Sequence, residues 1–312
     1  MITPHPFRFG VQASGPADAA GWSEFARKAE SLGVSTLTMA DHFSDQLAPI
    51  AGLMAAAMAT SDLRVGALVL CNDYRHPVVV AKEAATIDVL SGGRLELGLG
   101  AGWMTTDYAE AGLDLDPAGT RIDRLAEAVG VVKALFAGDA VHHSGEHYRI
   151  DGLVGTPAPV QRPHPPLLIG GGGPRVLRLA AREADIVGVN IDLRAGVIDA
   201  SAGPNATLEA TDEKIAWIRD AAGQRVDDIE LQIRVHLATV TDDRNGVAAA
   251  MAPALGLTPA AALETPHALV GTTSQIAEQL IARRERWGLS YIGISASSLD
   301  EMAPVIAQLA GT

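Results

Sequence analysis

The chain has 312 residues and a net charge of −13, which argues against the basic surface that nucleic-acid binding requires. Hydrophobic residues make up 48% of the chain and charged residues 20%, a composition that excludes a disordered protein. Cys71 is the only cysteine, which excludes an internal disulfide and a cysteine-rich metal site. No signal-peptide pattern is visible and no apolar run approaches the roughly 20 residues that span a bilayer, so we expect a cytoplasmic protein without a membrane partner.

The first hundred residues alternate between short apolar runs and helical patterns. This spacing predicts strands at 7–12, 36–40, 64–70 and 95–99, separated by helices at 19–32, 49–60 and 78–90. Each strand with its helix takes about 30 residues, the length of a parallel crossover unit. The strands lack strict alternation, which is typical of strands buried on both faces of a parallel sheet.

The rest of the chain continues this pattern less regularly. We predict a helix at 119–137, a β-hairpin at 141–156 that turns at Ser144–Gly145, and a Pro-rich extended segment to 166. Later strands are predicted at 167–170, 186–190, 229–240 and 291–295, with helices at 176–184, 211–222, 243–264 (in pieces), 272–287 and 299–309. Eight strands, mostly followed by helices, predict one α/β domain over 1–312. Its fold would be a (β/α)8 TIM barrel with a β-hairpin insertion, and the insertions would lie at about 141–166 and 191–210.

Chemistry in such barrels lies where the strands end, and this rule selects a few polar residues. Asp41 and His42 follow the second strand. Histidine titrates near neutrality, so His42 is a candidate for proton transfer, and Asp41 could orient it or cap a helix. Cys71 and Asn72 follow the third strand, but no basic partner for a nucleophilic Cys71 is nearby in the sequence. A small buried residue is therefore the stronger interpretation of Cys71.

A glycine run follows the fifth strand. Gly171, Gly172 and Gly173 precede Pro174 and Arg175 at the start of a predicted helix. Such a run leaves backbone N–H groups free to surround an anion at the positive end of the helix. We therefore predict phosphate binding here, with a flexible strand-to-helix turn as the alternative.

A second glycine pattern occupies the stretch 95–103, LELGLGAGW. Strand interiors normally avoid glycine, yet Gly98, Gly100 and Gly102 alternate here. We interpret the pattern as clearance for a flat ligand close to the backbone, with Trp103 as a wall of the substrate pocket. The glycine spacing does not match a dinucleotide-binding fingerprint.

The predicted hairpin carries His142, His143 and His147. No carboxylate pattern accompanies them, so we predict no metal site.

Taken together and in order, these segments resemble the luciferase-like flavin and deazaflavin oxidoreductases, and most of all the branch that uses coenzyme F420. The resemblance covers nearly the whole chain, and the combination of SGGRLELGLGAGW with IGGGGPR is specific to the superfamily. The matching segments are FRFGVQ, MADHF, VLCNDYRHP, LSGGRLELGLGAGWMTTDY, GEHYRIDG, PPLLIGGGGPRVLRLAAREADIVG and LVGTTSQIAEQL.

The resemblance implies a ring of F420, or alternatively of FMN, at the C-terminal mouth of the barrel. A non-proline cis peptide at or next to Cys71–Asn72 would back the ring, with Gly100 and Gly102 beside it. The segment 171–175 would take the phosphate. Asp41 and His42 would face the cofactor or the substrate, and the protein would be a homodimer.

Two departures from the family pattern affect the expected substrate. Met104 stands where many relatives carry Asn, and 103–106 lacks the acidic residues of the sugar-phosphate dehydrogenases. We therefore do not expect a sugar-phosphate substrate, and His42 is the best remaining candidate for the proton donor. The predicted function is hydride transfer between F420 and an unidentified small organic substrate. The alternatives are an FMN-dependent monooxygenase and a non-catalytic deazaflavin carrier or sensor.

Overall fold

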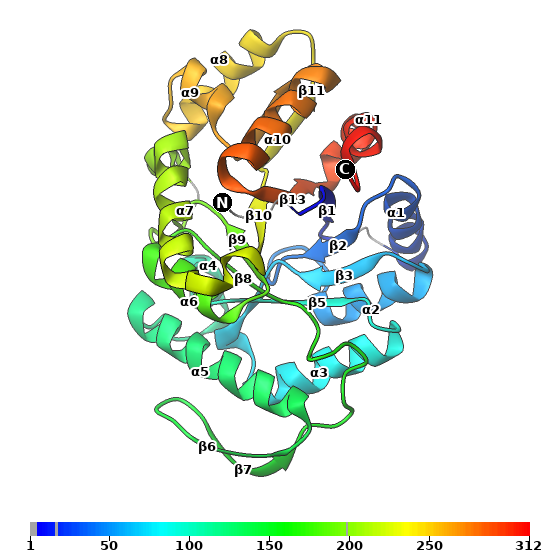
Figure 1. Ribbon diagram of the computed structural model, residues 1–312, viewed down its shortest axis with the longest axis vertical. Helices are drawn as coiled ribbons and strands as arrows, with labels where there is room; N and C mark the ends of the chain where they lie inside the picture. Colours follow the sequence, from blue (N-terminus) through cyan, green and yellow to red (C-terminus); the bar gives the residue numbers. More distant parts are fainter. Residues whose placement is uncertain (1–4, 16–17, 198) are drawn as a thin grey trace.

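Parallel strands form a closed barrel in the computed structural model, which describes residues 5–15, 18–197 and 199–312 (Figure 1). Strand β3 pairs with both β2 and β5, and this double pairing closes the sheet on itself. The predicted TIM barrel is confirmed. The barrel strands of the described residues are β1 (Arg8–Gln12), β2 (Thr36–Met39), β3 (Arg64–Ala67) continued by β4 (Leu70–Cys71), β5 (Leu95–Gly100), β8 (Leu167–Gly171), β9 (Ile186–Val189), β10 (Glu230–Arg234) and β13 (Leu289–Ser295).

Helices surround the barrel and bury their apolar faces against it. Strands β2, β5 and β9 are buried at every residue, as expected for parallel strands covered on both faces. The predicted capping box is present at the start of α10, where Thr272 and Gln275 satisfy each other's backbone N–H groups. The surrounding helices are α1 (Ala19–Ser31), α2 (Pro49–Ala59), α3 (Pro77–Leu90), α5 (Ala118–Ala137), α6 (Pro174–Glu183), α7 (Leu208–Ala222), α10 (Thr273–Trp287) and α11 (Leu299–Leu309).

The predicted third strand, 64–70, is interrupted between β3 and β4. The peptide bond Leu68–Val69 is cis at this interruption. The non-proline cis peptide that the resemblance implies is therefore present, but its expected position at Cys71–Asn72 is wrong. The strand ends at Ala67 and resumes at Leu70.

The alternate glycines of β5 face this interruption. A Cβ on Gly98 would lie 1.9 Å from the carbonyl oxygen of Ala67, and one on Gly100 would lie 2.4 Å from Cγ2 of Val69. Real Cβ atoms do not approach other atoms this closely. These two glycines are thus required by the chain itself, because they make room for the β3–β4 segment. Their interpretation as clearance for a flat ligand stays a prediction.

The predicted seventh strand, 229–240, divides in two. β10 ends at Arg234, and β11 (Leu237–Val240) leaves the barrel to pair in parallel with β12 (Ala268–Gly271). The change of partner is visible in the backbone, where Val235 N donates to Gly293 O but His236 N donates to His267 O. Helices α8 (Arg244–Leu255) and α9 (Pro259–Glu264) confirm the predicted helical pieces.

The two predicted insertions lie outside the barrel wall. The hairpin of β6 (Ala140–Ser144) and β7 (Arg149–Val154) is confirmed and projects beyond α5 at one end of the molecule (Figure 1). The second insertion contains the 3₁₀ segment η2 (Ala200–Ala206), and α7 begins a few residues earlier than predicted. One short helix, α4 (Thr105–Ala111), was not predicted, and the other 3₁₀ turns are η1 (Asn72–Tyr74), η3 (Gly223–Asp227) and η4 (Ala296–Ser298). No helix within the described ranges is long and apolar enough to cross a membrane.

Candidate active site

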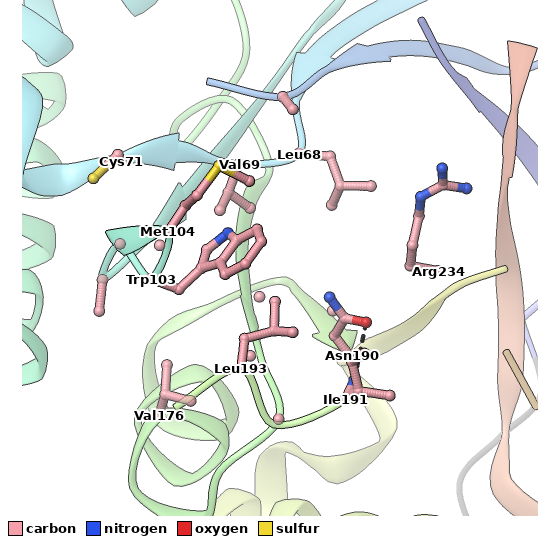
Figure 2. A pocket seen from close by; sticks show the side chains of 18 of the residues that line it. Leu68, Val69, Cys71, Trp103, Met104, Val176, Asn190, Ile191, Leu193 and Arg234 are labelled. Atoms are coloured by element: carbon pink, nitrogen blue, oxygen red, sulfur yellow. Dashed lines mark hydrogen bonds between the residues drawn. The ribbon is translucent and has the colours of Figure 1, made fainter. Parts of the chain in front are cut away.

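A cavity of about 370 Å³ opens at the C-terminal ends of the barrel strands, and its size lies in the range of small-molecule sites. The strand ends, the start of α6 and the segment 190–194 all line this cavity. Figure 2 shows Trp103 and Arg234 on opposite sides of it. The labelled side chains between these two are Leu68 and Val69 along one edge and Asn190, Ile191 and Leu193 along the other.

His42 reaches the cavity from the end of β2 and is held by a buried carboxylate. Nδ1 of His42 donates to Oδ2 of Asp107 over 2.6 Å, and the hydroxyl of Tyr74 donates to the same oxygen over 3.2 Å. Because a carboxylate only accepts hydrogen bonds, this contact places the proton of the neutral ring on Nδ1. Nε2 of His42 is then the ring nitrogen left to exchange a proton with a ligand. The ring of Trp103 meets that of His42 edge-on at 5.7 Å.

The sequence analysis missed Asp107, which lies in the first turn of α4. Sixty-five positions separate it from His42, so no local pattern connects the two residues. The segment MTTDY offered one signal, an acidic residue in the first turn of a short helix directly after the glycine-rich strand end. The segment 103–106 lacks an acidic residue, as noted above, and the first acid after Trp103 in the sequence is the one that contacts His42.

Asp41 lines the cavity, but its carboxylate holds the neighbouring strand. It forms an ion pair with both Nη atoms of Arg75 and accepts a hydrogen bond from the backbone N–H of Cys71 over 2.9 Å. The carboxylate that contacts His42 belongs to Asp107 and not to Asp41. A catalytic role for Asp41 stays a prediction.

Cys71 and Asn72 differ in their access to the cavity. Cys71 lines it, and burial raises the pKa of its thiol to about 11, which keeps the group neutral near pH 7. This supports the interpretation of Cys71 as a small buried residue. Asn72 is buried outside the cavity lining, where its side-chain amide donates to the hydroxyl of Tyr148 over 3.1 Å. Its predicted contact with the cofactor therefore has no support in this geometry.

Two of the predicted ring contacts do line the cavity. Gly100 and Gly102 both border it, and Gly102 adopts φ +76°, a left-handed conformation that favours glycine. The guanidinium of Arg121 donates to the carbonyl oxygens of Ala101 and Gly102 and holds this turn in place.

The segment 171–175 at the end of β8 lies partly in the cavity lining and partly outside it. Gly171, Gly172 and Gly173 line the cavity, and no side chain caps the N-terminus of α6 at Gly173. Backbone N–H groups at this helix end are therefore available to an anion. Pro174 and Arg175 lie outside the cavity lining, and Arg175 is exposed and paired with Asp123.

One carboxylate lies close to this helix end. Oδ2 of Asp192 would be 3.5 Å from a Cβ on Gly173, and Arg194 forms an ion pair with that carboxylate. The positive charge of Arg194 partly offsets the negative charge that would oppose an anion at Gly173.

Two cations near the ends of β9 and β10 have no carboxylate partner among the described residues; Arg234 lines the cavity and Lys214 lies outside its lining. The fully buried Lys214 donates to the carbonyl oxygens of Asn190 (2.9 Å) and Asn205 (2.7 Å), and burial lowers the pKa of Lys214 to about 8. The largely buried Arg234 contacts carbonyl and hydroxyl oxygens, and burial lowers its pKa to about 10. In addition, the ring of His267 donates to the carbonyl oxygen of Arg234 over 2.9 Å.

Two of the hairpin histidines each contact one acidic residue. His142 contacts Asp151, and His143 contacts Glu127. Within the described part of the chain no group of three His, Cys, Asp or Glu side chains is arranged to hold a metal ion. The prediction that the protein uses no metal remains to be tested.

Comparisons with known proteins give a consistent family. The family model described as "Luciferase-like monooxygenase" matches residues 1–202. An F420-dependent glucose-6-phosphate dehydrogenase from Nakamurella multipartita is 30% identical over 256 residues, which cover 77% of this chain and 70% of the relative.

Solved structures agree on the fold. The F420-dependent tetrahydromethanopterin reductase from Methanopyrus kandleri superposes with a TM-score of 0.76 at 17% identity, covering 98% of this chain and 100% of the reductase. A monooxygenase from Streptomyces bottropensis superposes with a TM-score of 0.71 at 23% identity, covering 97% of both chains. At these identities the structures support the barrel fold and do not distinguish between the two activities.

Proposed function

The chain belongs to the luciferase-like monooxygenase family, and from this premise we propose that it is an oxidoreductase that transfers a hydride between coenzyme F420 and a small organic substrate. One observation carries the proposal. The same cavity contains an uncapped helix N-terminus at Gly173 and a His42–Asp107 pair with a free ring nitrogen. The first feature suits the phosphate of a cofactor, and the second suits proton transfer to a reacting substrate.

The residues of the cavity fit the cofactor in charge and shape. Gly171, Gly172 and Gly173 would hold the phosphate with backbone N–H groups at the uncapped end of α6. The apolar side chains of Val69 and Trp103 would contact the ring. When bound, F420 supplies a two-electron hydride carrier, which is chemistry that no side chain of the protein can perform.

The protein itself controls a proton. Nε2 of His42 exchanges a proton with the oxygen of the substrate while the substrate gains or loses its hydride. The Asp107 carboxylate, 2.6 Å from Nδ1, stabilises the positive charge that His42 carries after it accepts this proton. Burial raises the pKa of Tyr74, so its hydroxyl stays a hydrogen-bond donor and fixes the Asp107 carboxylate.

The decisive experiment compares the two candidate cofactors on the purified protein. Fluorescence titration measures the Kd for F420 and for FMN, and stopped-flow absorbance then follows oxidation or reduction of each with a panel of alcohols, aldehydes and unsaturated acids. We expect binding and turnover with F420. Turnover with reduced FMN and oxygen, but none with F420, contradicts the proposal in favour of a monooxygenase. F420 binding without turnover of any substrate favours a carrier or sensor.

A further inference from the structure

Arg234 lies at the end of β10, on the side of the cavity opposite Trp103 (Figure 2). Its Nη1 donates to the carbonyl oxygens of Val235 (2.5 Å) and Gly293 (3.3 Å). Its Nη2 donates to the hydroxyl of Ser295 over 2.8 Å. These contacts hold the guanidinium in place and leave part of its hydrogen-bonding capacity unused.

The unused part is the Nε–Nη2 edge. Nε–H and the second N–H of Nη2 have no acceptor among the described residues. Nε is not among the fully buried atoms that lack a partner, and the side chain that carries it lines the cavity. Two parallel N–H groups on one edge of a guanidinium match the two oxygens of a carboxylate.

Other arginines of this chain use the same edge for carboxylates. Nε and Nη2 of Arg8 donate to the two oxygens of Glu230 over 2.7 Å and 2.5 Å. Arg286 holds Asp212 in the same way over 2.9 Å and 2.5 Å. Arg234 presents this geometry without a carboxylate of the described chain to fill it.

The carboxylates that line the cavity are all engaged elsewhere. Asp41 pairs with Arg75, Asp107 with His42, and Asp192 with Arg194. Consistent with this, burial alone accounts for the lowered pKa of Arg234, with no compensating negative charge. A guanidinium buried without a counter-charge is costly, and an anionic ligand would offset that cost.

We infer that Arg234 binds the carboxylate of a small monoanionic substrate through its Nε–Nη2 edge. This inference rests on the proposed function for the identity of the cavity as a substrate site. Among the described arginines that line the cavity, only Arg234 leaves both N–H groups of its Nε–Nη2 edge unfilled, and three carboxylates line the same cavity. This balance favours a ligand with a single negative charge over a phosphate dianion. A substrate held there would place its reacting carbon between Arg234 and the wall that carries His42 and Trp103.

Calorimetric titration of matched ligand pairs tests the inference without turnover. The probes are benzoate against benzamide and crotonate against crotonamide, which differ in charge but little in shape, and glucose 6-phosphate as a dianion. Each probe is titrated into both the apo protein and the protein saturated with oxidised F420. We expect each carboxylate to bind at least about tenfold more tightly than its amide, and more tightly than glucose 6-phosphate.

Three variants test whether Arg234 is responsible for the preference for a carboxylate over its amide. Arg234→Gln should reduce the preference for the carboxylate to within about twofold, and Arg234→Lys should keep part of it because the charge remains without the planar edge. Arg286→Gln is the matched control, since its Nε–Nη2 edge already holds Asp212 outside the cavity lining, and it should keep the preference. The melting temperature of Arg234→Gln should equal or exceed that of the wild type, because the substitution removes a charge buried without a counter-charge.

Four results would overturn the inference: no carboxylate binding up to about 10 mM, equal binding of acid and amide, a preference that survives in Arg234→Gln, or tighter binding of glucose 6-phosphate. A loss of F420 affinity in Arg234→Gln with an intact carboxylate preference would assign the arginine to the cofactor instead. Failure of the proposed function is distinguishable, because a protein that does not bind F420 still reports the carboxylate preference in its apo form.

Discussion

The two sides of the cavity differ in how their charges are balanced. On the side built from β2, β4 and the segment after β5, Asp41 meets Arg75, Asp73 meets Arg124 and Asp107 meets His42. There, Arg121 alone of the described cations contacts only carbonyl oxygens. On the side built from β9, β10 and β13, Asp192 and Arg194 form one closed pair. The lining Arg234 and the buried Lys214, which lies outside the lining, contact carbonyl or hydroxyl oxygens and no described carboxylate.

This difference separates two tasks that an active site must perform. Closed ion pairs fix side chains in one geometry before a ligand arrives, as proton transfer requires. Cations that only carbonyl oxygens satisfy remain able to gain from an anion, as selective binding requires. The first side is therefore suited to chemistry and the second to recognition, and the following predictions test that division.

The largest expected effect is on the rate of hydride transfer. His42→Asn keeps a side-chain N–H for Asp107 but cannot exchange a proton, so we expect the single-turnover rate to fall about 10³-fold. The Kd for F420 should change by no more than about twofold, because the cofactor is held by backbone groups of another strand. An unchanged rate with every productive substrate would show that His42 is not catalytic.

The next effect is on stability and concerns the packing of the first side. Gly98→Ala would place a Cβ 1.9 Å from the carbonyl oxygen of Ala67, so the free energy of unfolding should fall by about 3 kcal/mol. Gly130→Ala in α5 is the control, since a Cβ there meets nothing within 4 Å and should stabilise the helix by about 0.5–1 kcal/mol. Urea denaturation measures both, and equal effects would contradict the close approach of β5 to the β3–β4 segment.

The buried Lys214 on the second side should make the free energy of unfolding depend on pH. Burial lowers the pKa of Lys214 from 10.5 to about 8, so between these values the unfolded chain binds a proton that the folded protein has released. The free energy of unfolding should therefore rise by up to about 3 kcal/mol as the pH increases from about 8 to about 10.5.

Lys214→Met isolates this contribution. The difference in unfolding free energy between wild type and variant should carry the pH dependence, because the titration of the tyrosines is common to both proteins and cancels. A difference that does not change with pH means that Lys214 keeps an ordinary pKa in the folded protein.

The smallest effect distinguishes Asp107 from Asp41, the two acids of the first side that line the cavity. Asp107→Asn removes the charge beside His42, and we expect kcat to fall about tenfold with KM and the Kd for F420 unchanged. Asp41→Asn removes the partner of Arg75, and we expect it to lower the melting temperature more and kcat less. The reverse ranking in kcat would return the catalytic role to Asp41.

Local patterns in the sequence determined most of the secondary structure and the region of the site. The helix at 273–287 follows from its capping box, and the buried strands at 36–39 and 95–100 follow from their apolar runs. The carboxyl ends of parallel strands meet at one rim, so the sequence also placed His42, Cys71, Gly100 and Gly171 around one cavity.

Only the tertiary structure decided which side chains face each other across that rim. Asp107 and His42 are 65 positions apart, and the glycines at 98 and 100 are required by the β3–β4 segment of another unit. Arg234 is the last residue of β10, where the sequence continues without a visible break. Its Nε–Nη2 edge lacks an acceptor because the described carboxylates that line the cavity are already paired. Hydrogen bonds and ion pairs depend on distances in space, and residue order constrains those distances only within a single helix, strand or turn.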